Sequence, residues 1–476
     1  MLALAIYMIL AVLFYMIAGQ QLRVRADSTD SVSPSASVGE ILSDMRLEQQ
    51  FTVQSDRFTS FSVLCGTFGR QNSGTLLLEL YEQAGPDEKT LIEAFSVDLS
   101  GLQDNSWYTV QLTQPLENAA GKTMLLEVSA EDSTLGNAVT LYYGDSVSTG
   151  RVEITSEGWT PLLQNGQPLE GTLCLRTTGE TDLWFGRYYW YFAAAAGLLL
   201  ALYFWRLCRL KEKGKTCLGL RLINALSRYR FLIQQLVSRD FKTKYKRSVL
   251  GIVWSFLNPL LTMLVQYAVF STIFKSDIPN FPVYLLTGIV LFNFFNEACS
   301  MGITSILGNA SLITKVYVPK YIYPVTRVLS SGINMLFSLV PLLLVILLTR
   351  TALTPAILLL PFALACLLCF CTGMVLVLSA SMVFFRDTQF LWNVLSMIWM
   401  YATPIFYPES IIPDRFLIVY KFNPLYHFIR FARTVIMDGV SPEPKAYLIC
   451  LVFAVGSLIL GGLIFRKAQD KFVLYI

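Results

Sequence analysis

The chain has 476 residues, of which 54% are apolar and 15% are charged, and its mean hydropathy is +0.52. A soluble chain of this size carries more charge, so the composition predicts a membrane protein. His427 is the only histidine in the sequence. A single imidazole argues against histidine-based zinc sites and Ser-His-Asp catalysis, in which imidazoles are held close to other groups.

The formal net charge of +4 combines two parts of opposite sign. Residues 21–185 hold 23 Asp and Glu against 9 Lys and Arg, whereas residues 186–476 hold 10 acids against 28 bases. Because those bases lie between apolar stretches, we expect them to meet anionic lipid headgroups rather than nucleic acid. Cys65 and Cys174 are the two cysteines of the acidic part, and the sequence leaves open whether they form a disulfide.

Eight apolar stretches are long enough to cross a bilayer. They cover residues 1–18, 188–205, 249–274, 283–306, 325–349, 356–385, 389–405 and 447–465. The pattern predicts an anchor over 1–20, a second span over 186–206 and a core of six spans over 249–476. The first stretch has no Lys or Arg ahead of it, which favours a retained anchor over a cleaved signal peptide.

Charge sets the expected orientation of these spans. Residues 206–247 carry thirteen bases and two acids, which places this segment in the cytoplasm. Within it, residues 207–248 predict a basic amphipathic helix in the inner interface. Both termini then face the cytoplasm of a bacterium, and residues 21–185 lie outside its plasma membrane. Residues 406–440, rich in proline, predict a re-entrant outer hairpin, too short in its apolar run to cross.

Residues 21–185 predict an all-β sandwich of eight or nine strands. Runs of alternating apolar and polar residues recur between Gly, Asn, Asp and Pro, as in residues 75–82. Residues 27–37 are rich in Ser and Asp and predict a flexible linker. The pattern loosely resembles carbohydrate-binding modules, so four aromatic residues are candidates either for core packing or for sugar stacking: Trp107, Tyr142, Tyr143 and Trp159.

Basic residues crowd the segment before the third span, where they either anchor the span or meet an anionic headgroup or pyrophosphate coming from the inner leaflet. The residues are Arg239, Lys242, Lys244, Tyr245, Lys246 and Arg247.

A second group lies in the outer halves of two core spans and the loop beyond. Its aromatic members form either an interface belt or a lining on which sugar rings slide. Glu297 is costly inside a span, so it either pairs with an inner cation or serves a channel. The group comprises Phe292, Phe294, Phe295, Glu297, Trp399, Tyr401, Phe406 and Tyr407.

Four sequence blocks follow one another in a recognisable order. They are residues 239–260 (RDFKTKYKRSVLGIVWSFLNPL), 309–320 (NASLITKVYVPK), 384–387 (FFRD), and 404–408 (PIFYP) followed by 423–425 (NPL). On a six-span frame, this set resembles the membrane subunit of polysaccharide-exporting ABC transporters, the O-antigen and teichoic-acid permeases. The resemblance covers residues 220–476, while the first anchor and the β domain depart from the family's minimal permease.

The resemblance implies a type-2 ABC exporter core working as a homodimer with two ATP-binding subunits. It also assigns residues 309–320 to a short cytoplasmic coupling helix, which can seat against a soluble partner; a plain turn between spans is the alternative. The coupling residues would be Asn309, Leu312, Ile313, Lys315, Val316, Tyr317, Pro319 and Lys320.

The chain lacks a phosphate-cradling loop of its own. Two Gly-Lys-Thr triplets, at 121–123 and 214–216, have Leu116 and Arg209 where the motif needs glycine. We therefore expect no catalytic residue, cofactor or metal here, with ATP and magnesium bound by a separate subunit.

The expected cargo is a lipid-linked polysaccharide or teichoic-acid-like polymer moving outward. Three alternatives stay open: an exporter of a drug or small lipid, a surface adhesin, and a membrane glycosyl- or acyltransferase using Glu409 and Asp414.

Overall fold

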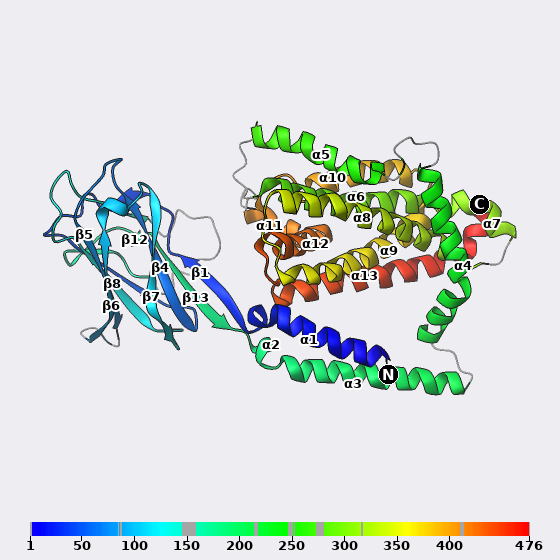
Figure 1. Ribbon diagram of the computed structural model, residues 1–476, viewed down its shortest axis with the longest axis horizontal. Coiled ribbons are helices and arrows are strands. Elements are labelled where there is room, and N and C mark those ends of the chain that lie inside the picture. Colours follow the sequence, from blue (N-terminus) through cyan, green and yellow to red (C-terminus); the bar gives the residue numbers. More distant parts are fainter. Residues whose placement is uncertain are drawn as a thin grey trace. The chain divides into compact units, whose positions relative to one another are not determined.

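The computed structural model describes residues 2–475 except 84, 86–87, 145–158, 214–217, 246–250, 252, 273–279, 316–317 and 410–413. The chain divides into two compact units (Figure 1). One comprises Arg23–Arg187 and consists mainly of β-strands, and the other comprises Met1–Leu22 with Tyr188–Ile476 and is helical. The predicted fold class, a polytopic helical protein with a separate β domain, is confirmed.

The β unit consists of two antiparallel sheets that enclose one apolar core. The first sheet has the order β1-β13-β4-β9-β12, with β2 paired to β9 and β7 paired to β4, and the second has the order β11-β10-β3-β8-β5-β6. The strands are β1 (Val24–Asp30), β2 (Ala36–Ser37), β3 (Arg46–Thr52), β4 (Arg57–Gly66), β5 (Thr75–Gln83), β6 (Lys89–Asp98), β7 (Ser106–Glu117), β8 (Thr123–Ser129), β9 (Thr140–Gly144), β10 (Leu163–Gln164), β11 (Gln167–Pro168), β12 (Thr172–Leu173) and β13 (Leu175–Asp182).

Alternation along β5 shows why the sequence folds into a sandwich. Leu76, Leu78 and Leu80 are buried in the core, whereas the residues between them are partly exposed, as a strand with one buried face requires. The linker expected over 27–37 is wrong in its first part, because β1 pairs along the whole of β13, from Val24 opposite Asp182 to Asp30 opposite Arg176. Backbone pairing to a neighbouring strand orders a polar sequence that has little tendency to form a strand alone.

Cys65 and Cys174 are both buried in the β unit, and neither is in a disulfide. Burial raises the pKa of each thiol to about 12, because the thiolate would lose its hydration.

Six helices of the second unit are long and apolar enough to cross a membrane within the described part of the chain. They are α1 (Leu2–Arg23), α3 (Tyr189–Glu212), α6 (Phe281–Ile303), α8 (Ile322–Leu348), α9 (Leu360–Phe384) and α13 (Pro444–Ala468). The core contains two further predicted spans, α5 (Val253–Thr272) and α10 (Thr388–Tyr401). With 14 residues, α10 extends only about 21 Å, which is less than a hydrocarbon core of about 30 Å.

In the described part of the chain, six further helices lie between or beside these spans, and α4, with 28 residues, is the longest of them. They are α2 (Trp184–Arg187), which belongs to the β unit, α4 (Leu218–Tyr245), α7 (Ala310–Lys315), α11 (Asp414–Lys421), α12 (Pro424–Arg433) and α14 (Phe472–Tyr475). A π-helical segment, Thr434–Asp438, directly continues α12.

Helix α6 contributes many residues to the apolar core of the helical unit and packs against α5, α8 and α9 (Figure 1). Helices α9 and α13 meet so closely that a Cβ on Gly461 would lie 2.2 Å from the carbonyl oxygen of Gly373. About one turn earlier in each helix, Ser457 of α13 donates a hydrogen bond of 3.0 Å to the carbonyl oxygen of Phe370 in α9. Small residues let two membrane helices approach with backbone in contact.

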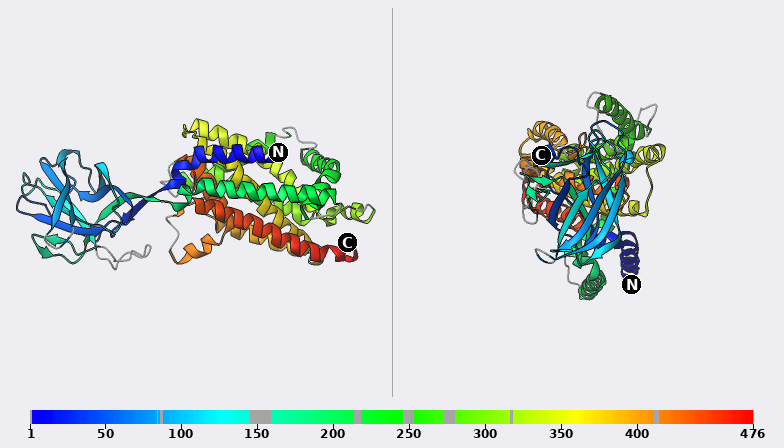
Figure 2. Two further views of the ribbon diagram at one scale, coloured as in Figure 1. Left: turned by 90° about the horizontal axis from the view of Figure 1, so that it is seen from below. Right: turned by 90° about the vertical axis from the view of Figure 1, so that its left-hand side faces the viewer.

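The two N-terminal spans form a pair, α1 beside α3 (Figures 1 and 2). Tyr7 donates to the carbonyl oxygen of Ala193 at 2.7 Å, and Tyr189 donates to that of Ala11 at 2.8 Å. Each tyrosine thus satisfies a hydroxyl that would be costly to leave unpaired in lipid.

The segment expected to form a re-entrant hairpin contains α11 and α12, of 8 and 10 residues. At the end of α12, the buried guanidinium of Arg433 donates to the carbonyl oxygens of Tyr284 (3.1 Å), Pro404 (2.7 Å) and Ile405 (3.2 Å). A broken backbone inside a helical bundle needs such partners, because no water reaches its carbonyl groups.

Candidate functional site

A polar cavity of about 640 Å³ lies among α4, α5, α6 and α8. Its walls are built of amide, hydroxyl and charged side chains together with one indole. They comprise Lys244, Trp254, Asn258, Pro259, Thr262, Asn293, Asn296, Glu297, Ser300, Asn334 and Ser338.

Helical spacing explains how these residues meet. Trp254, Asn258 and Thr262 lie four residues apart and therefore share one face of α5, and Asn334 and Ser338 share one face of α8 in the same way. On α6, the residues from Asn293 to Ser300 recur at intervals of three and four. Polar stripes on otherwise apolar spans turn toward protein rather than lipid, so three stripes converge on one cavity.

Glu297 holds the inner end of this cavity together. Its carboxylate accepts a hydrogen bond from the Asn334 amide at 2.6 Å and forms an ion pair with Lys244 at 2.8 Å. Both charged side chains remain partly exposed to the cavity. Lys244 is thus the basic partner that the sequence analysis weighed for Glu297, and it comes from the basic interfacial segment.

The cavity also contains an amide oxygen, that of Asn296, which is buried and has no hydrogen-bond partner among the described residues. Asn293 and Ser300 beside it are exposed, and their side chains can hydrogen-bond a ligand that brings hydroxyl groups. Amides, hydroxyls and one aromatic face are the groups with which proteins bind neutral, hydroxyl-rich molecules.

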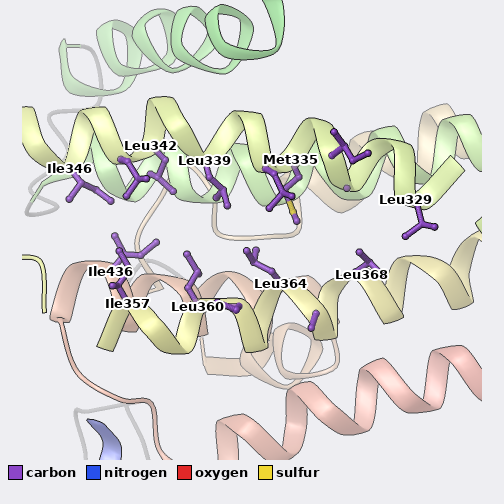
Figure 3. A pocket seen from close by; sticks show the side chains of 16 residues that line it. Leu329, Met335, Leu339, Leu342, Ile346, Ile357, Leu360, Leu364, Leu368 and Ile436 are labelled. Carbon is purple, nitrogen blue, oxygen red and sulfur yellow. The ribbon is translucent and has the colours of Figure 1, made fainter. Parts of the chain in front are cut away.

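A second cavity, of about 570 Å³, separates α8 from α9 (Figure 3). Figure 3 shows Leu339 and Leu342 of α8 facing Leu360 and Leu364 of α9. Every side chain that lines it is apolar, so it offers nothing to hydrogen-bond a polar ligand.

Helix α4 packs its apolar face, including buried Leu236 and the partly buried Ile233, against one end of the bundle. At its C-terminal part, Asp240 is buried and forms an ion pair with Arg327 of α8 at 2.8 Å. The neighbouring Arg239 donates to the side-chain oxygen of Asn309 at 3.2 Å. Helix α4 therefore links α8 to the segment expected to couple the permease to an ATPase.

That segment begins with a 3₁₀ turn, Leu307–Asn309, and continues as α7. Asn309 is buried and donates to the carbonyl oxygen of Ser305 at 2.7 Å, so it holds the segment in place instead of facing a partner. Leu312 is 38% exposed, and Lys315 is exposed beside it. Ile313 turns back toward the apolar cluster under α4.

Residues after α7 tie it to the end of the chain. Lys320 donates to the carbonyl oxygen of Gln469 at 2.6 Å, and Pro319 is partly buried next to it. Val316 and Tyr317 lie outside the described residues. Of the six residues expected to meet a headgroup, Lys242 is exposed and Tyr245 ends α4, while Lys246 and Arg247 also lie outside the described residues.

The aromatic residues expected to line a channel are separated by the structure. Phe292, Phe294, Phe295 and Phe406 are buried within the helical core, so they are not available to a passing chain. The ring of Phe295 lies 5.1 Å from that of Trp399 and packs as any core side chain does. When nearly all residues of a span are apolar, the sequence does not show which face of the helix is buried. The prediction that these phenylalanines line a channel was wrong for this reason.

The remaining members lie nearer the surface. Tyr401 is 61% exposed. Trp399 donates its indole N–H to the side chain of Asn423 at 2.8 Å, and the Tyr407 hydroxyl lies 3.0 Å from that of Tyr420. These contacts tie α10 to the hairpin through the Asn-Pro-Leu block of the sequence.

The four aromatic candidates of the β unit do not share a surface. Trp159 bridges to Phe51 in the second sheet and stacks on its ring, 5.5 Å away. Trp107 and Tyr142 belong to strands of the first sheet, as does Tyr143. The Trp107 ring is covered by a guanidinium, that of Arg176, at 4.5 Å.

Most residues of the polar cavity are neither charged nor aromatic, so the features on which the site was predicted do not mark them. The signal that could have found them is the recurrence of Asn, Ser and Thr at intervals of three or four within apolar spans, as in Asn258 and Thr262 or Asn334 and Ser338.

Several helices long and apolar enough to cross a membrane, the helix α4 packed at one end of their bundle, and a polar cavity among them are typical of a permease-type membrane subunit. Residues 231–437 match the ABC-2 type transporter family, and the chain belongs to this family.

Several characterised permeases are similar to the chain. The O-antigen export system permease protein RfbA of Myxococcus xanthus is 30% identical over 256 residues, which cover 53% of this chain and 98% of that protein. The protein of the same name from Klebsiella pneumoniae is 30% identical over 245 residues, or 51% and 93% of the two chains. The polysialic acid transport protein KpsM of Escherichia coli is 22% identical over 247 residues, or 50% and 93%.

Proposed function

We propose that the chain is the permease subunit of an ATP-driven exporter that moves a lipid-linked polysaccharide or teichoic-acid-like polymer out of the bacterial cytoplasm. The observation that carries this proposal is the polar cavity of about 640 Å³ within the membrane helices, lined by side chains suited to hydroxyl groups. Similarity to O-antigen and polysialic acid permeases supports a polysaccharide cargo.

In this proposal, two copies of the chain form the path and two ATP-binding subunits dock at α7. Exposed Leu312 and Lys315 would meet the ATPase, while Asn309 and Ile313 hold α7 to the permease. Movement of α7 would reach α4 through Arg239 and then α8 through the Asp240 ion pair. The end of the bundle that carries α4, α7 and the C-terminus would face the cytoplasm, and residues 21–185 would lie outside.

Export of a drug or small lipid is the second candidate within the same family. The apolar cavity between α8 and α9 favours it, because that cavity suits a ligand without hydrogen-bonding groups (Figure 3). Polymer export requires the polar cavity instead, so variants in the two cavities distinguish the candidates.

The first experiment is affinity purification of the chain in mild detergent, followed by mass spectrometry of the bound proteins. We expect an ATPase with a phosphate-binding loop in about equal amount. If the chain is purified without an ATPase and still converts a lipid-linked sugar, the exporter proposal is wrong and the protein is an enzyme.

The docking surface has its own test. Leu312→Asp places a charge on the exposed apolar position of α7 and should release the ATPase, whereas Ser311→Ala, also at an exposed position, should retain it. If both variants retain the ATPase, the ATPase does not dock at α7.

A further inference from the structure

A third cavity, of about 730 Å³, lies between α12, the segment that follows it and the start of α13. It occupies the end of the helical unit that carries α11 and α12, away from the end with α4 and α7 (Figure 1). None of the roles described above uses it.

Three cations surround the mouth of this cavity. Lys421 closes α11, Arg430 lies on α12 and Lys445 lies in the first turn of α13, whereas Glu443 is the one acid in the described lining. Within the described part of the chain, neither lysine has a carboxylate within ion-pair distance. Arg430 donates to the Tyr426 hydroxyl at 3.0 Å and forms an ion pair of 3.9 Å with Glu409. With Glu409 and Glu443 set against the three cations, one positive charge remains at the mouth, and it is carried by the two lysines, which have no ion pair among the described residues.

The floor of the cavity is fixed by a histidine. His427 stacks on the ring of Phe453, 5.6 Å away, and its Nε2 lies 2.8 Å from the carbonyl oxygen of Lys421. These contacts hold the end of α11, and with it the lysine backbone, against α13. Packing thus fixes the backbone of Lys421 at the cavity, while its charged side chain is exposed.

Below the cations, one face of α13 continues the cavity as an apolar wall. Leu448, Val452 and Phe453 line it, and the first two are 61% and 60% exposed. At 1.5 Å per residue, Val452 lies about 10 Å deeper along the helix than Lys445. Since α13 is a candidate membrane span from Pro444 onward, the cations lie at the level of lipid headgroups and the wall at the level of acyl chains.

We propose that this cavity binds a phosphate-bearing membrane lipid, with the phosphate among Lys421, Arg430 and Lys445 and an acyl chain along Leu448 and Val452. Cations above an apolar wall match both parts of such a molecule. A zwitterionic lipid would bring its own cation against these three, and a sugar would gain little from the apolar wall. The proposal does not depend on which cargo the permease moves.

The test is photo-crosslinking of the full-length chain in vesicles with phosphatidylglycerol that carries a diazirine in its acyl chain. Peptide mass spectrometry then maps the labelled residues. We expect residues 448–453 to be labelled about tenfold more by this lipid than by phosphatidylcholine with the same chain. Equal labelling by the two lipids would overturn the proposal.

Two double variants separate a specific site from general attraction. Lys421→Gln with Lys445→Gln should remove most labelling of residues 448–453, while Arg466→Gln with Lys467→Gln, at the other end of α13, should leave it intact. Labelling at other sites in the same sample reports that the first variant is folded. If both variants label residues 448–453 alike, the lysines do not bind the headgroup.

A further arm adds inorganic phosphate as the competitor. Unchanged labelling supports a lipid headgroup, because free phosphate gains nothing from the apolar wall. Loss of labelling in millimolar phosphate would mean that the cations hold a free anion instead, and the lipid assignment would fail.

Discussion

Asp240→Asn tests the link between α4 and α8. The Asp240 side chain is 4% exposed, and the side chain of its partner Arg327 is 19% exposed. The substitution keeps the shape of the side chain and removes its charge, so Arg327 is left with a neutral acceptor in a largely buried position. The hydroxyl of Ser330, 3.4 Å from the carboxylate, offers little replacement.

The expected cost follows from this geometry. Removing one member of a fully buried ion pair costs about 3–5 kcal/mol. Because Arg327 retains some contact with water and the amide oxygen still accepts a hydrogen bond, we expect the free energy of unfolding to fall by about 2 kcal/mol. Arg327→Gln in the same chain removes the stranded charge and should restore part of that loss.

Unfolding in mixed detergent micelles, followed for both single variants and the double variant, measures the coupling between the two residues. Asp387→Asn is the matched control, because Asp387 is exposed and has no ion pair among the described residues. If Asp240→Asn unfolds like the control, or if the two single effects simply add, the ion pair does not join α4 to α8.

Three further predictions concern other parts of the chain. Asn334→Leu should lower polymer export about tenfold without changing the amount of protein in the membrane, because Glu297 loses a hydrogen bond and the cavity loses a polar wall. Export at the normal rate would show that the polymer does not pass through this cavity. Cys65 and Cys174 should resist maleimide at pH 8 in the folded chain and react fully in denaturant, since a pKa of about 12 leaves roughly one thiol in ten thousand ionised. Rapid labelling without denaturant would contradict the burial of these two thiols. Arg433→Met should cost about 3 kcal/mol and expose residues 406–440 to protease, because the hairpin loses the hydrogen bonds that join Arg433 to the carbonyl oxygens of Tyr284, Pro404 and Ile405. An unchanged cleavage pattern would show that other contacts hold the hairpin.

Much of the fold follows from patterns that the sequence displays openly. Long apolar stretches predict the spans, and the alternation of Leu76, Leu78 and Leu80 predicts a strand with one buried face. The end of α10 was missed because the apolar run continues past Tyr401 into the buried start of the hairpin, where Ile405 and Phe406 pack in the core. An apolar run indicates that a segment is buried, but it does not indicate whether that segment is helical.

The candidate site was harder to predict, because its residues gain their role from helix packing. Asn258 and Asn334 are common polar residues in their own spans, and they form a site only once α5 and α8 bring them together around Glu297. Phe295 shows the opposite case, since its chemistry suits a sugar ring but the packing of α6 places it in the core. Which face of a helix meets its neighbours depends on contacts between segments far apart in the chain.

The glycine contact between α9 and α13 limits how the bundle can change shape. Where Gly373 meets Gly461 backbone to backbone, no side chain is present to change rotamer, so neither helix can slide or rotate against the other without a steric clash. We therefore expect these two helices to move together. Among the described residues, the contacts of α5 and α8 around the polar cavity contain no such backbone-to-backbone approach of two glycines, so we expect the bundle to deform more easily there than between α9 and α13.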